Sequence, residues 1–218
     1  MTNQEKAMLI AITWGALLVL YAIGRLLQKR RPAARSILTL DTEKVDTSSP
    51  PGTLLSKTGV LWVFGANIIS LFLLFLEAWY PALGGNARLV MLRLPMWAEI
   101  VGIALFLLIT VWSLFAMLYN PTYTPLYRLP PHRFALATRG PYAIIRHPRY
   151  TAEALLNITL FLFTGMWLPL LGLIGWAAVV GQARAEERFL MKLAPRAYAN
   201  YQRKTGMFFP KMGGKKTG

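Results

Sequence analysis

The sequence predicts an all-α, polytopic membrane protein with five transmembrane helices. Three observations predict it. Hydrophobic residues make up 55% of the 218 residues and are gathered in long blocks. These blocks match the roughly 20 residues that a helix needs to cross a bilayer core about 30 Å thick. Lys and Arg fall mainly in the segments that would lie on one side of the membrane, as in many membrane proteins.

The first two blocks predict two separate membrane helices. Ala7–Leu27 has no charged residue before Arg25, and Val60–Trp79 is interrupted only by Glu77. The first block is longer than the apolar region of a secretory signal peptide and has no small-x-small cleavage site before Arg25. We therefore expect an uncleaved anchor.

The remaining apolar residues predict three more helices. Met96–Tyr119 forms one block, and proline after Asn120 is expected to stop its helix. The stretch Thr151–Gly181 is broken near its middle by Gly165 and Pro169, so it predicts a fourth and a fifth helix that form a helical hairpin.

Composition divides the chain into two parts. We expect residues 1–58 to be a transmembrane anchor with a cytosolic linker, because Asp41–Lys57 is polar, contains Pro and Gly, and cannot bury a core. Residues 59–218 are then a four-helix membrane core. The polar segment Thr122–Arg149 and the C-terminal residues are expected to form a cytosolic cap on this core.

The net charge of +15 is distributed asymmetrically. With five spans, one face of the membrane receives 21 of the 24 Lys and Arg residues, in the segments Arg25–Lys57, Asn120–Arg149 and Arg184–Gly218. Basic loops stay in the cytosol, so the C-terminus is expected there and the N-terminus outside. This distribution suits membrane lipids as partners and argues against nucleic acid. The chain has no cysteine, and we predict no metal site.

Two polar clusters flank the expected hairpin. Gly140–Tyr150 precedes it, and Glu186-Glu187 with Tyr198 and Tyr201 follows it. A hairpin returns the chain to the same face, so the clusters should lie close together. Carboxylates suit a bound ammonium group, a guanidinium suits a bound carboxylate, and tyrosine rings suit a planar ring or a cationic centre. S-adenosylmethionine has all of these groups.

The same residues resemble a known family. Gly140-Pro141-Tyr142, then Arg146-His147-Pro148-x-Tyr150, a hydrophobic hairpin, Glu186-Glu187 and Tyr198-x-x-Tyr201 resemble the isoprenylcysteine carboxyl methyltransferases, which group with the phospholipid N-methyltransferases. The end of the chain, around Phe209-Pro210, resembles prokaryotic members. The resemblance covers about Leu136–Lys211 and implies an integral protein of a prokaryotic inner membrane.

The resemblance also implies residue roles. His147, Pro148 and Tyr150 would line the cleft of the cofactor S-adenosyl-L-methionine, and Tyr142 and Arg146 would form its wall. Glu186 and Glu187 would hold the polar end of the cofactor, with Tyr198 and Tyr201 beside it. Arg149 stands where the family commonly has Met, and Thr151-Ala152 replaces an expected Gly. These departures leave the expected cofactor unchanged and bear on the identity of the methyl acceptor.

Glu153 and Arg146 are the candidate catalytic residues. Glu153 lies three positions after Tyr150, so both are expected on neighbouring parts of one helix face. Ionisable groups inside a membrane are costly and often functional. Glu153 either pairs with a nearby arginine or faces the acceptor, and in the second case it favours an acceptor that must lose a proton.

Three classes of function remain open at this stage. The first is methyl transfer to a lipophilic acceptor, which could be a prenylcysteine, a phospholipid or other amine, a quinone-like lipid or a small thiol. The second is a membrane oxidoreductase similar to the sterol reductases, which uses a nicotinamide cofactor. The third is a non-enzymatic membrane scaffold. The oligomeric state does not follow from the sequence.

Overall fold

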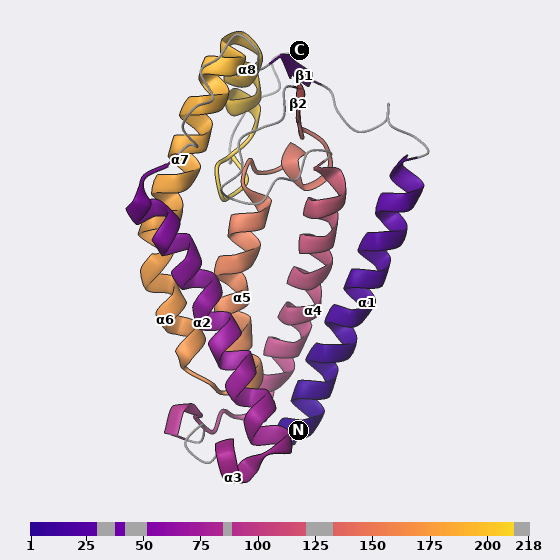
Figure 1. Ribbon diagram of the computed structural model, residues 1–218, viewed down its shortest axis with the longest axis vertical. Helices are drawn as coiled ribbons and strands as arrows, with labels where there is room; N and C mark the ends of the chain where they lie inside the picture. The colour runs from indigo at the N-terminus through magenta and orange to yellow at the C-terminus, as the bar shows by residue number, and fades with distance from the viewer. Residues whose placement is uncertain (30–37, 42–51, 85–88, 121–132, 212–218) are drawn as a thin grey trace.

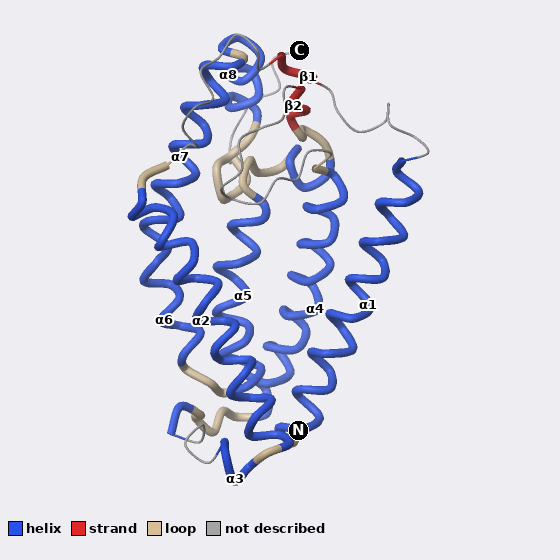
Figure 2. The backbone as a smooth tube through the Cα atoms, in the orientation of Figure 1, coloured by secondary structure: helices blue, strands red, loops and turns tan. Residues whose placement is uncertain are grey.

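The computed structural model describes residues 1–29, 38–41, 52–84, 89–120 and 133–211 (Figure 1). The described residues form an elongated helical bundle with one small sheet, and loops connect the helices (Figure 2). The long helices are α1 (Asn3–Lys29), α2 (Leu54–Trp79), α4 (Met96–Tyr119), α5 (Pro148–Thr164) and α7 (Trp176–Leu193). The short ones are α3 (Pro81–Gly84), η3 (Gly140–Ala143), α6 (Leu168–Gly172), η4 (Leu173–Gly175) and α8 (Pro195–Lys204).

Four helical stretches of the described residues are long and apolar enough to cross a membrane. They are Asn3–Leu27, Leu54–Trp79, Met96–Tyr119 and Leu168–Leu193, the last running from α6 through η4 into α7. The prediction of an integral membrane protein is confirmed at this level. The helix α5 has 17 residues, so the fifth predicted crossing stays a prediction.

The helix boundaries follow local sequence signals. Before α2, the hydroxyl of Thr53 accepts a hydrogen bond from the backbone N–H of Ser56 at 3.2 Å. This cap starts α2 at Leu54, earlier than the apolar block predicted and inside the segment expected to be linker. Pro148 occupies the first turn of α5, a position that proline favours.

The turn after α5 depends on glycine. Gly165 has φ +79°, and a Cβ atom there would lie 2.3 Å from the carbonyl oxygen of Leu92. Only glycine fits both the left-handed conformation and the close approach. The chain then reverses, because Tyr150 near the start of α5 contacts Glu186 of α7 whereas Asn157 further along lies against Gly172 of α6.

The core consists of two apolar clusters at different heights of the bundle. The lower cluster joins α1, α2, α4 and α5 through Ala7, Ile10, Leu71, Leu74, Ala78, Phe106, Leu160, Phe163 and the loop residue Met166. The upper cluster joins α2, α5, α7 and the C-terminal segment through Val60, Val63, Tyr150, Val179, Ala183 and Phe208. The outer surface is rich in exposed Leu, Ile, Val, Phe and Trp side chains, which a bilayer would cover.

Ion pairing ties α1 to the rest of the bundle. Lys6 Nζ lies 2.6 Å from Glu99 Oε1 of α4, and the N-terminal ammonium lies 3.4 Å from Glu99 Oε2. The Lys6 side chain is only 6% exposed, so this contact is largely buried. The expected division of the chain into an anchor and a core stays a prediction, although the first turns of α1 pack on the core through Ala7 and Ile10.

The small sheet was not predicted. Strand β1 (Leu38–Asp41) pairs antiparallel with β2 (Arg133–Leu136), with Leu38 opposite Leu136. It links the segment after α1 to the segment after α4 at the upper end of the bundle (Figures 1 and 2). Residues 42–51 of the expected linker and 121–132 around the start of the expected cap lie outside the described residues.

Candidate active site

Backbone pairing brings the two predicted clusters together at the upper end of the bundle. The segment before α5 runs alongside the segment after α8, where Ile145 and Gly206 form a parallel bridge. The N–H of Arg146 donates to the Gly206 carbonyl at 2.8 Å, and the N–H of His147 donates to the Met207 carbonyl at 3.0 Å. The C-terminal segment is therefore fixed against the start of α5.

Arg146 is held by acceptors on both α7 and α8. Its Nε donates to Glu187 Oε1 at 2.7 Å, and a terminal nitrogen donates to Glu187 Oε2 at 3.3 Å. The other terminal nitrogen donates to the backbone carbonyls of Gln202 and Thr205. The two side chains are only 11% and 9% exposed. A bidentate guanidinium–carboxylate pair of this kind fixes the relative position of the segments that carry it.

His147 stands between the two carboxylates. Its Nε2 lies 3.1 Å from Glu187 Oε1, and its Nδ1 lies 3.8 Å from Glu186 Oε2. The Tyr150 hydroxyl donates to Glu186 Oε1 at 2.6 Å. The imidazole and the Tyr150 ring stack with their centroids 5.6 Å apart. Four residues predicted for the cofactor site are therefore in mutual contact.

The carboxylates of Glu186 and Glu187 differ in their hydrogen-bond partners and in their exposure. Glu187 is bound by Arg146, by His147 and, at 2.8 Å, by the amide of Gln202, and its side chain is 9% exposed. The Glu186 side chain is 27% exposed. Glu187 consequently joins several segments of the chain, whereas part of the Glu186 carboxylate is exposed at the surface.

Sequence reasoning missed two glutamines that orient these carboxylates. Gln182 lies four residues before Glu186 on α7 and donates to it at 3.2 Å, while its own oxygen accepts from Ser56 of α2 at 2.7 Å. Gln202 of α8 binds Glu187. The four-residue spacing on one helix face was the available signal for Gln182. The contact of Gln202 depends on how α8 folds back, which no local pattern reveals.

Three predicted tyrosines surround this cluster. Tyr201 donates to the carbonyl of Tyr142 at 2.7 Å, so α8 is tied to η3. Tyr198 is 1% exposed and packs on Tyr201, with ring centroids 5.9 Å apart. Burial raises the pKa of both Tyr198 and Tyr201 above the usual value, so they remain neutral. Tyr142 also accepts a hydrogen bond from Asn120 at the end of α4.

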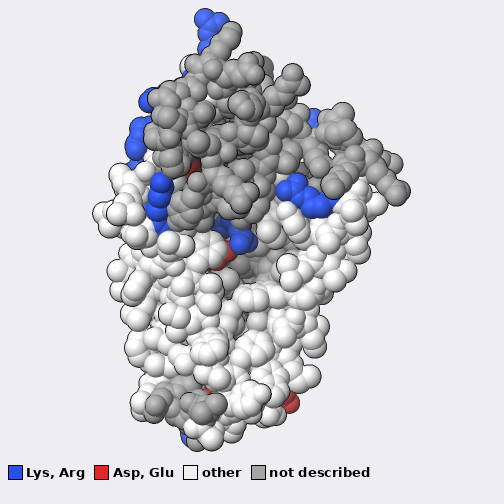
Figure 3. Space-filling view, viewed as in Figure 1, with Lys and Arg blue, Asp and Glu red and all other residues white. Residues whose placement is uncertain are grey.

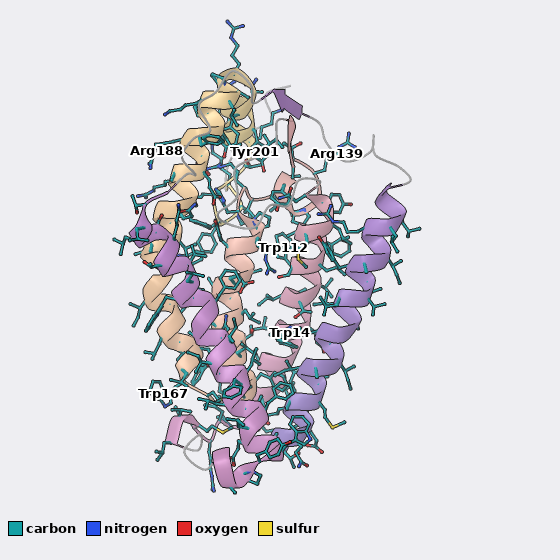
Figure 4. All side chains as sticks on the ribbon, in the orientation of Figure 1. Trp14, Trp112, Arg139, Trp167, Arg188 and Tyr201 are labelled. Atoms are coloured by element: carbon teal, nitrogen blue, oxygen red, sulfur yellow. The ribbon has the colours of Figure 1, made fainter. Side chains whose placement is uncertain are left out.

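Pro148 helps to position the start of α5 through its backbone carbonyl. Its carbonyl accepts a hydrogen bond from the indole N–H of Trp112 of α4 at 3.2 Å, and Trp112 lies between α4 and α5 (Figure 4). The start of α5 is thus held by α4 on one side and by the C-terminal segment on the other.

An open pocket of about 250 Å³ adjoins this cluster, lined by Arg184, Glu187, Arg188, Met191 and Gln202. It lies between α7 and α8, so it places arginines beside the Glu187 carboxylate. In Figure 3, most of the basic groups drawn lie in the upper half of the molecule, several of them along the α7 and α8 side.

Glu153 lies inside α5, below this cluster, and is 6% exposed. Its Oε1 lies 2.9 Å from a terminal nitrogen of Arg149, four residues earlier. The structure therefore shows the arginine pairing that the sequence left open as one alternative. The catalytic roles expected for Glu153 and Arg146 stay predictions.

Long apolar helices with a largely buried Arg–His–Glu cluster at one end define the class of protein as an integral membrane protein with a polar site. Residues 96–195, from α4 to the start of α8, match the family model described as phospholipid methyltransferase (PEMT). Over these residues the chain is similar to the phospholipid methyltransferase family, which includes isoprenylcysteine carboxyl methyltransferases and phospholipid N-methyltransferases.

The family match confirms the resemblance predicted from the sequence, and the protein is a membrane methyltransferase. It supports this reading over the reductase and scaffold alternatives. A search of curated proteins gave no significant match. The family implies a methyl donor, whereas the acceptor is not shown.

Proposed function

We propose that the protein transfers a methyl group from S-adenosyl-L-methionine to a lipophilic acceptor at the membrane–cytosol interface. The contact of Glu186 with His147 and Tyr150 carries this proposal, because it joins a partly exposed carboxylate to aromatic and imidazole rings. The cluster lies within the segment that matches the family, apart from its α8 residues. Such a site has the donor and acceptor groups that a zwitterionic cofactor with a cationic centre requires.

The chain's own residues would divide the work of binding. Glu186 would accept hydrogen bonds from the ammonium group of the methionine moiety. Arg184 and Arg188, beside the pocket, would attract its carboxylate. Arg146 and Glu187 would hold α7 and α8 against the start of α5, and so keep the walls of the site at a fixed separation.

When bound, S-adenosyl-L-methionine would supply an activated methyl group, whose transfer would break the S–CH3 bond, form an acceptor–CH3 bond and leave a neutral thioether. Little covalent help is needed for such a displacement, so positioning both reactants is the main task of the protein. The acceptor would reach the site from the bilayer, past the apolar outer surface of the bundle. The aromatic rings of Tyr150 and Phe208 would limit the access of water.

A phospholipid or other amine is the second candidate acceptor. The description of the matching family names phospholipids. Glu153, buried in α5 one turn below Tyr150, could take the proton that a protonated amine must lose. A prenylcysteine carboxylate is already nucleophilic and needs no such base.

For the arrangement in the membrane, we propose five crossings with α5 as the fourth. A helix of 17 residues is about 25 Å long, close to the thickness of the bilayer core. The N-terminus would lie outside, and the C-terminus would lie in the cytosol of a prokaryotic cell together with α8. The concentration of basic residues at that end supports this orientation.

Calorimetry on the detergent-solubilised protein tests the cofactor assignment. Saturable binding of S-adenosylmethionine and S-adenosylhomocysteine is expected. Tight binding of a nicotinamide cofactor in their place would overturn the proposal. Incubation with native lipid extract and S-adenosylmethionine labelled in the methyl group should then label a lipid, and its chromatographic identity reveals the acceptor.

A further inference from the structure

Close packing of α2 on α7 brings the start of α2 to the candidate active site. The two helices meet through small residues. A Cβ atom on Gly59 would lie 2.1 Å from the Cβ of Ala178, and one on Gly175 would lie 2.6 Å from the Gly59 carbonyl oxygen. A larger residue at either glycine would push the helices apart. Ser56, one turn before Gly59, is therefore held against α7.

A buried amide joins the two helices. The Gln182 side chain of α7 is fully buried, and its Oε1 lies 2.7 Å from the hydroxyl of Ser56, which is 6% exposed. The Nε2 of Gln182 lies 3.2 Å from Glu186 Oε1. Ser56 lies outside residues 96–195, so the family match does not cover this part of the site.

Donor and acceptor chemistry fixes the direction of these hydrogen bonds. An ionised carboxylate has no proton to donate, so the amide presents its N–H to Glu186 and its carbonyl to Ser56. The Ser56 hydroxyl has a single proton, and its 2.7 Å contact with Gln182 is shorter than its 2.9 Å contact with the Thr53 carbonyl. The hydrogen bonds therefore run in one direction, from α2 through Gln182 to Glu186.

The carboxylate of Glu186 is held by one of its two oxygens. Its Oε1 accepts from Gln182 of α7 and, at 2.6 Å, from the Tyr150 hydroxyl of α5. Rotation of the carboxylate would break both hydrogen bonds. The second oxygen, Oε2, lies 3.8 Å from His147 Nδ1, which is beyond hydrogen-bond distance, and the Glu186 side chain is 27% exposed. The oxygen left for a bound ammonium group is therefore Oε2.

We propose that Gln182, itself oriented by Ser56, is a positioning residue that holds Glu186 with Oε2 toward the ammonium group of the cofactor. This inference rests on the proposed function, in which Glu186 binds that ammonium group. Because Gln182 is fully buried, it acts on the ligand only through Glu186. The first turn of α2, which the sequence assigned to a linker, thereby contributes to the cofactor site.

Two ligands separate positioning of Glu186 from a general effect on the fold. S-adenosylhomocysteine carries the ammonium group, whereas 5′-methylthioadenosine has the adenosine and the thioether sulfur without the amino-acid part. Gln182→Met has a side chain of similar length that donates no hydrogen bond. In calorimetry on the detergent-solubilised protein, this variant should bind S-adenosylhomocysteine about tenfold more weakly than the parent, because a hydrogen bond to a charged group is lost. Its affinity for 5′-methylthioadenosine should be unchanged.

A double variant tests whether Gln182 acts through Glu186. Glu186→Ala removes the carboxylate that Gln182 is proposed to hold, so the position of that carboxylate no longer matters. Addition of Gln182→Met to Glu186→Ala should then cause no further loss of affinity for S-adenosylhomocysteine. Two independent effects would instead multiply.

Ser56→Ala tests the same hydrogen bonds through a smaller change, which keeps the inference open to test if Gln182→Met does not fold. It leaves the Gln182 carbonyl without its donor from α2, so S-adenosylhomocysteine should bind several-fold more weakly and 5′-methylthioadenosine as before. Thr58→Ala is the matched control, because the exposed Thr58 hydroxyl donates to the Leu55 carbonyl of its own helix at 3.0 Å. It should leave both affinities unchanged.

Equal loss of affinity for both ligands in Gln182→Met would show that Gln182 is merely structural and would overturn the inference. Unchanged affinity for S-adenosylhomocysteine in the folded variants, or a further loss in the double variant, would overturn it as well. If the parent binds both ligands and no variant shows the selective effect, the inference alone is wrong. If the parent binds neither ligand, the proposed function is wrong, and the inference with it.

Discussion

The carboxylate of Glu187 is bound by the guanidinium of Arg146, 2.7 Å away, although the two residues are 41 positions apart in the chain. This pair joins the end of α7 to the residues just before α5. The same guanidinium binds backbone carbonyls of α8 and of the segment after it. One ion pair thus fixes three segments of the active site.

Removal of Glu187 should therefore weaken both stability and cofactor binding. Glu187→Ala leaves Arg146 and His147 without their shared acceptor, in surroundings where breaking a buried pair costs about 3 kcal/mol. We expect a lower unfolding temperature in detergent and at least about a tenfold loss of affinity for S-adenosylmethionine. Thermal unfolding and calorimetry measure these effects.

Lys192→Ala, on an exposed position of the same helix, is the control and should change neither quantity. The double variant Arg146→Ala with Glu187→Ala should lose less stability than the two single variants lose together. Each single variant leaves a buried charge without its partner, whereas the double variant removes both charges. Strict additivity would show that the pair does not stabilise the protein.

Glu186 should behave differently from its neighbour. Its side chain is 27% exposed and is bound by Tyr150 and Gln182, so the fold depends on it less. Glu186→Gln keeps the shape and removes the charge. We expect affinity for S-adenosylmethionine to fall about tenfold, while the unfolding temperature stays close to that of the parent.

If affinity for S-adenosylmethionine is unchanged in Glu186→Gln but reduced in Glu187→Ala, the ammonium contact does not belong to Glu186. Tyr150→Phe provides a further comparison. It removes the hydroxyl that binds Glu186 and preserves the ring that stacks on His147, so a smaller loss of affinity is expected.

Much of this site could be predicted from the sequence because it depends on chain direction. Two apolar helices joined by a tight turn return to the same end of a bundle, so Tyr150 and Glu186 had to approach each other. Pro148 and Gly165 mark the two ends of α5 by rules that operate over a few residues. These features needed no knowledge of tertiary packing.

The contacts that were missed depend on backbone pairing between distant segments. Gly206 and Met207 are acceptors for Arg146 and His147 only through main-chain carbonyls, which have no side-chain signature. The β1–β2 pair has four residues in each strand, too few for an alternating pattern to be recognised. Whether Glu153 would pair with Arg149 depended on side-chain orientation, which spacing alone does not fix.

The proposed orientation can be measured directly, because the chain contains no cysteine and gives a clean background for labelling. In intact cells a membrane-impermeant maleimide should label Thr2→Cys and leave Lys211→Cys unlabelled until the membrane is opened. The physical reason is the retention of basic segments in the cytosol. Labelling of Lys211→Cys from outside, or of both positions from the same side, would contradict five crossings with a cytosolic C-terminus.

The last prediction concerns Glu153 and the nature of the acceptor. Its ion pair with Arg149, at 2.9 Å, keeps a carboxylate in the bundle one turn below Tyr150. The hypothesis is that this carboxylate takes a proton from an amine or another group that must lose one before methylation. Glu153→Gln keeps the size of the side chain and removes the base. Affinity for S-adenosylmethionine should then remain nearly intact, whereas turnover should fall about a hundredfold, within the usual contribution of a general base.

The pH dependence separates a base from a merely structural partner of Arg149. With a base, activity of the parent falls as the pH is lowered and Glu153 becomes protonated, and the Glu153→Gln variant lacks this acidic limb. A variant that is destabilised only by loss of the ion pair would keep the same pH profile at lower amplitude. Initial rates across pH, with labelled methyl donor and native lipid extract, provide the measurement. Normal turnover in Glu153→Gln, or a prenylcysteine analogue as the best acceptor, would mean that Glu153 is structural and that the methylated group needs no base.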